Sequence, residues 1–367
     1  MKILFICNTG HVVKWVDELR PKYETMALCW SPQEHSNIVK RAVEFDPDVV
    51  HFYWREHRDP KFTINAVKEL KKILRVPLIL QTDWQPRWLV DDDLEFANSG
   101  DLLITDTILG RDFYPGQVGL RIPTYYIGGE EYSIDYRFIG RGDNVWLTFE
   151  NLYDTLAGKS VLFDSRGTRK FNRQTKEWQE YTLNVVKVEN RKPIWGTMWH
   201  TRPELVMTDK FKLMNILKDK YKCRWFCGWT ANDAYSMRMW ANGAGVNENY
   251  YEPLEHMFIE YWEKLSECTC TLDNQYWGMS SLGTEAAALK IPHVGTPTVT
   301  SAVILNPKLV CEEDNLDQQA EKVRWLIDNP EEARKLGEEA HNNFLEHFSL
   351  ENKLKRFEGM LKRIGLN

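Results

Sequence analysis

The sequence carries its clearest chemistry at residues 277–292, WGMSSLGTEAAALKIP, where a predicted strand leads through small residues into a predicted helix. The first turn of a helix presents backbone N–H groups that lack intrahelical partners, so it attracts anions, and small residues let a diphosphate approach closely. The residues placed for such contacts are Ser280, Ser281, Gly283 and Thr284. Glu285 lies within the helix, where its carboxylate can accept hydrogen bonds from two neighbouring ribose hydroxyls. The alternative is an ordinary capped helix in which Ser281 or Thr284 caps and Glu285 suits the helix dipole.

Polar residues also follow predicted strands in the first half of the chain. Asp83 comes directly after a strand, where a carboxylate can act as a general base or simply cap the next turn, and Trp84 beside it can stack on a sugar. Gly10 and His11 follow the first strand, and His11 is a catalytic candidate against a structural alternative. His51 lies in an apolar run, which favours a histidine of the core or of a cleft wall.

The elements that position these residues form two series of alternating strands and helices. This alternation predicts parallel sheets, and therefore an α/β protein of two doubly wound, Rossmann-like domains facing a cleft. We predict an N-terminal domain at 1–140, a β-hairpin insertion at 141–192, a C-terminal domain at 193–345, and a C-terminal helix at 346–367 that can cross back to the first domain. Strands are predicted at 2–7, 26–30, 49–54, 77–82, 102–105, 123–127, 193–196, 223–227, 268–272 and 293–295. Helices are predicted at 12–22, 37–44, 63–74, 210–220, 254–265, 284–289, 316–328, 331–347 and 350–364.

Several segments in this order resemble the family 4 glycosyltransferases, which are retaining enzymes of GT-B architecture. The resemblance is carried by EAAALKIP at 285–292, the helices at 320–337, PDVVH at 47–51, PLILQTD at 77–83 and SGDLLI at 99–104. It implies transfer of a sugar from a nucleotide-sugar to an acceptor, with retention, without an essential metal and with no cofactor besides that substrate. It also implies that Glu285, with the start of its helix, binds the donor.

Two departures from the family pattern concern charge. Trp277 stands where the family carries a first acid, and Asp273 could replace that acid only through a different loop path. The family also has an Arg and a Lys that neutralise the diphosphate, for which Arg202 and Lys210 are the stand-ins, or else solvated surface charges. The alternatives left open are an inverting transferase with Asp83 or His11 as base and a non-catalytic nucleotide- or sugar-binding protein.

The segment 159–192 has nine Lys or Arg and four Asp or Glu in a chain whose net charge is −6. Such a basic hairpin can recruit DNA or another polyanion as acceptor, or solubilise an exposed strand edge. The acidic run at 91–93 favours a solvated helix start over a metal site, so we predict no metal residues.

The seven cysteines include no CxxC pair, and no apolar stretch approaches the ~20 residues of a membrane span. The sequence therefore predicts free thiols in a cytoplasmic protein.

Overall fold

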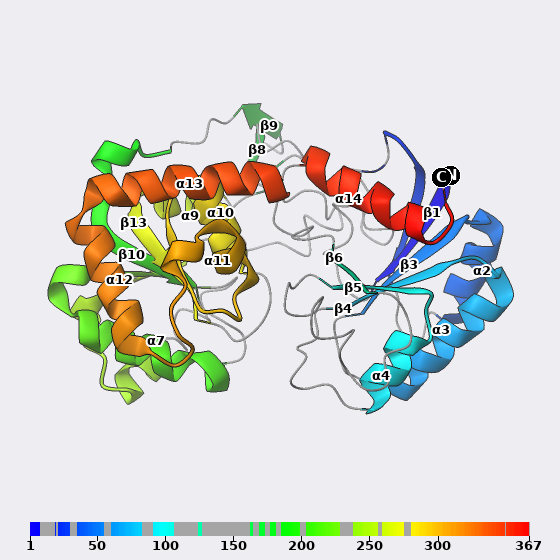
Figure 1. Cartoon of the computed structure of the whole chain (residues 1–367), viewed down its shortest axis with the longest axis horizontal. Helices are drawn as coiled ribbons and strands as arrows, with labels where there is room; N and C mark the ends of the chain where they lie inside the picture. The colour runs from blue at the N-terminus through cyan, green and yellow to red at the C-terminus, as the bar shows by residue number, and fades with distance from the viewer. Residues whose placement is uncertain are drawn as a thin grey trace. The chain divides into compact units, whose positions relative to one another are not determined.

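The computed structural model describes residues 1–7, 19, 21–29, 35–54, 60–82, 91–105, 124–126, 162–163, 169–172, 177–180, 185–198, 203–227, 238–255, 259–274, 280–348 and 350–366. These residues form two compact units (Figure 1). The described residues up to 126 belong to the first unit together with those from 350 onward, and the described residues from 162 to 348 belong to the second.

The first unit is built on a six-stranded parallel sheet in the order β2-β1-β3-β4-β5-β6. Its strands are β1 (Lys2–Cys7), β2 (Glu24–Cys29), β3 (Val49–Trp54), β4 (Leu78–Thr82), β5 (Leu102–Thr105) and β6 (Thr124–Tyr126). Its helices are α2 (His35–Phe45), α3 (Pro60–Leu74), α4 (Asp91–Asn98) and α14 (Leu350–Arg363). The strands are nearly continuous apolar runs because helices cover the sheet on both faces.

The two faces of this sheet have separate cores. On one face, α2, α3 and α4 pack through Ala42, Val67 and Phe96 among other residues. On the other face, the C-terminal helix α14 contributes Phe357 and Met360 to the same core as β1 and β3. The end of the chain therefore completes the core of the unit that contains its beginning.

The second unit has a five-stranded parallel sheet in the order β12-β11-β10-β13-β14. Its strands are β10 (Lys192–Met198), β11 (Cys223–Cys227), β12 (Tyr251–Glu255), β13 (Cys268–Leu272) and β14 (His293–Val294). Its helices are α7 (Pro203–Leu217), α9 (Ile259–Ser266), α10 (Ser281–Ala288), α11 (Thr300–Leu305), α12 (Leu316–Asp328) and α13 (Pro330–Phe348). Among the described residues of this unit, 3-10 turns lie at Val188–Asn190, Asp219–Tyr221, Glu248–Tyr250 and Pro307–Leu309. The prediction of two doubly wound α/β domains is confirmed.

A small antiparallel sheet precedes β10 in the sequence, as predicted for the insertion. It consists of β7 (Leu162–Phe163), β8 (Arg169–Asn172) and β9 (Glu177–Glu180). Its antiparallel register pairs Arg169 with Glu180 and Lys170 with Gln179.

Helix prediction was wrong over part of 254–265. Residues up to 255 form the edge strand β12, and the helix α9 starts only at Ile259. The strand is favoured because it pairs with β11 and because the buried Tyr251 packs edge-on against Trp225, with ring centroids 5.8 Å apart. Among the described residues, no helix combines the length and the hydrophobicity required to cross a bilayer.

Candidate functional site

The strand order of the second sheet creates a point where its connections diverge. Strand β10 has β11 on one side and β13 on the other, so chain connections leave the carboxyl ends of β10 and β13 in opposite directions. Open α/β sheets bind ligands at such a point. Helix α7 follows β10, and α10 follows β13, so both helices start near this edge.

The start of α10 is organised by Ser280, its N-cap. The Ser280 hydroxyl accepts a hydrogen bond from the backbone N–H of Gly283 at 3.4 Å and donates one to the Asp273 carboxylate at 2.7 Å. The backbone N–H of Ser280 donates to the Ser301 hydroxyl at 3.2 Å. The helix is therefore capped, but by Ser280 and not by Ser281 or Thr284, and the cap itself is tied to a carboxylate.

Asp273 also forms a buried ion pair. It follows β13 directly, and its Oδ1 lies 3.2 Å from the Nζ of Lys210 on α7. The Lys210 side chain is 0% exposed and that of Asp273 is 1% exposed. One carboxylate thus joins the helix after β10 to the N-cap of the helix after β13.

A neutral histidine lies behind this pair. His293 on β14 is fully buried, and its Nδ1 lies 2.9 Å from the Thr271 hydroxyl. Burial lowers the pKa of His293 to about 4, while Asp273 acts to raise this pKa and Lys210 to lower it. His293 is therefore neutral at pH 7 and adds no charge beside the ion pair.

The predicted donor residues whose burial is described are not equally buried. A Cβ added at Gly283 would lie 2.7 Å from the Ser301 Oγ and 2.9 Å from the His293 Cδ2, so this glycine permits close packing within the domain. Thr284 is also buried, whereas Glu285 is half-buried on the next position. Ser281 is the first residue of α10. Their contacts with a ligand remain predictions.

The structure places Lys210, but not Arg202, which lies outside the described residues. Lys210 is at the predicted edge, with its ammonium group against Asp273. Among the acceptor-side residues, only His51 is described. It is 1% exposed on β3, beside the Phe5 ring at 5.1 Å, and burial lowers its pKa to about 4. The residues Gly10, His11, Asp83 and Trp84 lie outside the described ranges.

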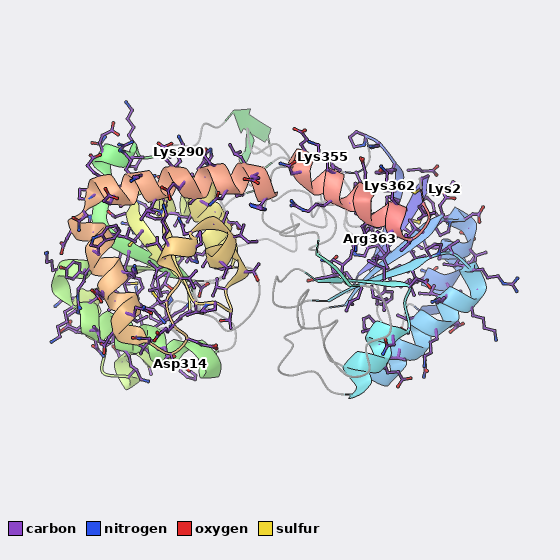
Figure 2. The ribbon with its side chains drawn as sticks, in the orientation of Figure 1. Lys2, Lys290, Asp314, Lys355, Lys362 and Arg363 are labelled. Carbon is purple, nitrogen blue, oxygen red and sulfur yellow. The ribbon has the colours of Figure 1, made fainter. Side chains whose placement is uncertain are left out.

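Sequence reasoning missed the residues that hold the other end of α10. The half-buried Arg191 donates to the carbonyls of Leu289 and Lys290 at 2.7 and 2.8 Å. Lys290 adopts a left-handed backbone with φ 60° and lies against α13 (Figure 2). A Cβ at Gly337 of α13 would meet the Lys290 carbonyl oxygen at 2.1 Å. The sequence indicates only that Arg191 is one of the basic residues of 159–192, whereas in the structure its hydrogen bonds hold the end of α10 in place.

A second ionic cluster lies at the amino edge of the same sheet. Arg224 on β11 is 2% exposed and contacts Glu267 at 2.8 Å and Glu252 at 2.9 Å. Glu267 also contacts Lys192 and Lys264. Although partial burial acts to raise the pKa of Glu267, hydrogen bonds from Lys192, Arg224 and Lys264 lower it to about 2. This cluster ties four elements together at the end of the sheet opposite the α10 start.

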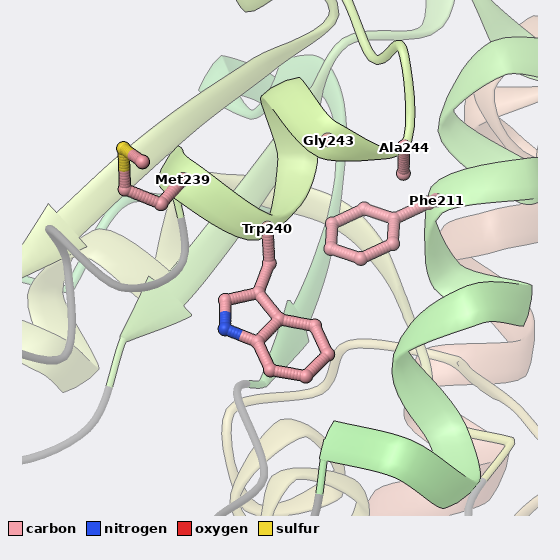
Figure 3. Close-up of a pocket in the computed structure, with 5 residues that line it drawn as sticks. All are labelled: Phe211, Met239, Trp240, Gly243 and Ala244. Atoms are coloured by element: carbon pink, nitrogen blue, oxygen red, sulfur yellow. The ribbon is translucent and has the colours of Figure 1, made fainter.

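An apolar hollow of about 450 Å³ lies beside α7 (Figure 3). Phe211 of α7 and Trp240 line it side by side. Met239, Trp240 and Gly243 belong to the short helical segment 238–243, and Ala244 follows it. Among the described residues, those that line the hollow carry no charge.

Comparison with known proteins identifies the fold. No protein-family model matches the sequence, and no curated protein is similar to it in sequence. Among solved structures, HepE from Anabaena in complex with UDP is 11% identical with a TM-score of 0.65, covering 99% of this chain and 100% of HepE. A glycosyltransferase from Rickettsia africae is 14% identical with a TM-score of 0.63, covering 100% of this chain and 99% of its own.

A putative UDP-N-acetylglucosamine 2-epimerase from Listeria monocytogenes is also similar, at 11% identity and a TM-score of 0.54, over 99% of this chain and 97% of its own. The structural neighbours include GT-B glycosyltransferases that match over the full length of this chain. The chain therefore has the GT-B fold.

Proposed function

We propose that this protein is a glycosyltransferase that moves a sugar from a nucleotide-sugar to an acceptor, with retention and without an essential metal. The start of α10 binds the diphosphate of the donor, and Glu285 binds the ribose. The N-terminal unit supplies the acceptor side through Asp83, His11, Gly10, His51 and Trp84.

The observation that carries this proposal is the Ser280-capped start of α10 beside the point where the strand order diverges. The N-terminal N–H groups and the dipole of α10 favour an anion. HepE, a protein of the same fold, has been solved with UDP and with UDP-glucose. Glu285 follows the buried Thr284 on α10. Its side chain is half-buried, so its carboxylate is partly accessible to a ligand.

In the transfer itself, charge develops on the departing diphosphate as the bond to the sugar breaks. Hydrogen-bond donors that are held in place before the reaction stabilise such charge without reorganising. Hydrogen bonds at both ends of α10 hold its backbone N–H groups in place. Retention is supported by the family resemblance of the sequence, although Trp277 stands at the position of that family's first acid.

The proposal is tested by incubating the purified chain with UDP, GDP, ADP and CDP sugars and measuring release of the nucleoside diphosphate with and without acceptors. We expect acceptor-dependent release with one nucleotide class, and an α-configured product from an α-configured donor by NMR. An inverted product would refute retention. Acceptor-independent conversion of the donor into a C-2 epimer would replace the proposal with an epimerase of the same fold.

Metal dependence is tested in the same assay. We expect activity to persist after treatment with EDTA, because the start of α10 is proposed to stabilise the leaving group. Loss of activity on chelation with recovery on adding Mn²⁺ or Mg²⁺ would contradict this part of the proposal.

A further inference from the structure

The buried pair Lys210–Asp273 has a consequence for how the donor is held, if the proposed donor site is correct. Lys210 is the cation that a diphosphate at the α10 start would be expected to meet, but its ammonium already lies 3.2 Å from a carboxylate. Both side chains are buried, at 0% and 1% exposed, so water does not screen the two charges from each other.

Asp273 is also engaged by the helix start itself. Its Oδ2 accepts the Ser280 hydroxyl at 2.7 Å, and the same hydroxyl accepts the N–H of Gly283. The carboxylate therefore occupies the end of α10 that favours negative charge, next to the cation that would neutralise a phosphate. Bound between Lys210 and Ser280, it is turned inward and does not serve as the missing acid that would face a transferred sugar.

We propose that Asp273 is a positioning residue that sets the affinity of this edge for a nucleoside diphosphate, because it cancels the charge of Lys210. The pair contributes no net charge to an incoming diphosphate. The donor is then held by the helix N–H groups and by hydroxyl contacts to the ribose, and the diphosphate product is not trapped by an uncompensated buried cation.

Removing the Asp273 charge should raise the affinity for UDP, whereas removing an ordinary binding residue lowers it. Asp273→Asn keeps the shape of the side chain but removes one negative charge beside Lys210, so UDP should bind more tightly. One added positive charge near the phosphates, in a site that water screens only in part, should tighten UDP binding on the order of tenfold or more. Uridine carries no phosphate, so its affinity should stay constant.

The test is calorimetric titration of UDP and uridine into the full chain, as wild type, D273N, and the double variant with Lys210→Met and Asp273→Asn. We expect D273N to bind UDP about tenfold more tightly, with a steeper dependence on salt, and the double variant to return to within threefold of the wild type. Uridine should bind equally to all three.

If the double variant loses UDP affinity tenfold or more, Lys210 is a direct phosphate ligand and the proposal is overturned. The same holds if D273N binds UDP as the wild type does. Should D273N fail to fold, the double variant, which carries neither charge of the pair, decides between these outcomes. If the wild type binds UDP and the variants bind it equally well, only the role of Asp273 is refuted. If the wild type binds none of UDP, GDP, ADP and CDP in the same titration, the donor site is refuted as well.

Discussion

The two edges of the second sheet handle buried charge in different ways. At the amino edge, Glu267 is shared among Arg224, Lys192 and Lys264, and Glu252 is 43% exposed, so the cluster is redundant and partly hydrated. At the carboxyl edge, Lys210 and Asp273 are both fully buried. The cluster at the amino edge joins strands and a helix. The Lys210–Asp273 pair lies beside a helix start, so it also sets the net charge that a ligand would meet there.

The largest expected effect comes from removing the carboxylate at the carboxyl edge. Asp273→Ala leaves Lys210 buried without this counter-ion, so the free energy of unfolding should fall by roughly 3–5 kcal/mol. Urea unfolding followed by circular dichroism measures the change. A loss below about 1 kcal/mol would mean that water or another group compensates Lys210, and the contrast between the two edges would disappear.

The next effect is on binding and should leave stability unchanged. Glu285→Gln removes a charged hydrogen-bond acceptor for the ribose, so UDP binding should weaken by about 1.5–3 kcal/mol while the melting temperature of the ligand-free protein stays constant. Glu252→Gln at the amino edge is the matched control and should leave UDP affinity unchanged. Equal UDP affinity for the wild type and the Glu285 variant would remove Glu285 from the donor site.

Acid should weaken the fold through the buried histidines. His293 behind the carboxyl edge and His51 in the first unit have folded pKa values of about 4, below the usual 6.5, because burial disfavours their charged forms. The unfolded chain therefore binds more protons between these values, and stability present above pH 6.5 is lost as the pH falls toward 4. From pH 7 to 5 each histidine should cost about 2 kcal/mol.

Urea unfolding at both pH values in wild type, His51→Gln and His293→Gln measures this contribution. Each substitution should make the loss of stability on acidification smaller. An equal loss in all three proteins would show that neither histidine governs the acid sensitivity.

The smallest effect is expected at the amino edge. Glu252→Gln removes one exposed partner of Arg224 while Glu267 remains 2.8 Å away, so the free energy of unfolding should fall by at most about 1 kcal/mol. The same urea experiment measures it. A loss as large as that of Asp273→Ala would show that this cluster is no more redundant than the pair at the other edge.

Much of the fold was predictable because its strands are short apolar runs bounded by turn residues. Strands β3, β5, β11 and β13 and helix α12 were predicted with the bounds that the structure has. Strand β12 was missed because Glu252, Pro253 and Glu255 interrupt its apolar pattern, which an edge strand tolerates. Helix α11 was missed because its six residues are too few to establish a helical period.

The candidate site was predictable only in part. Small residues before a helix indicated the start of α10, but the packing role of Gly283 depends on Ser301 and His293, which approach from other elements. The pairing of Lys210 with Asp273 joins α7 to the end of β13, and no local pattern encodes it. Charge counting likewise could not separate Arg191, which fixes α10, from the other basic residues around it.

The most direct test of the donor site is amide hydrogen exchange with and without saturating UDP. We predict slower exchange in peptides that cover residues 280–288, because the diphosphate would bind the first N–H groups of α10. Peptides of the amino edge around Glu252 and Glu267 should not change. If UDP binds but residues 280–288 exchange at the same rate, or if protection appears only elsewhere, the donor site does not lie at the start of α10.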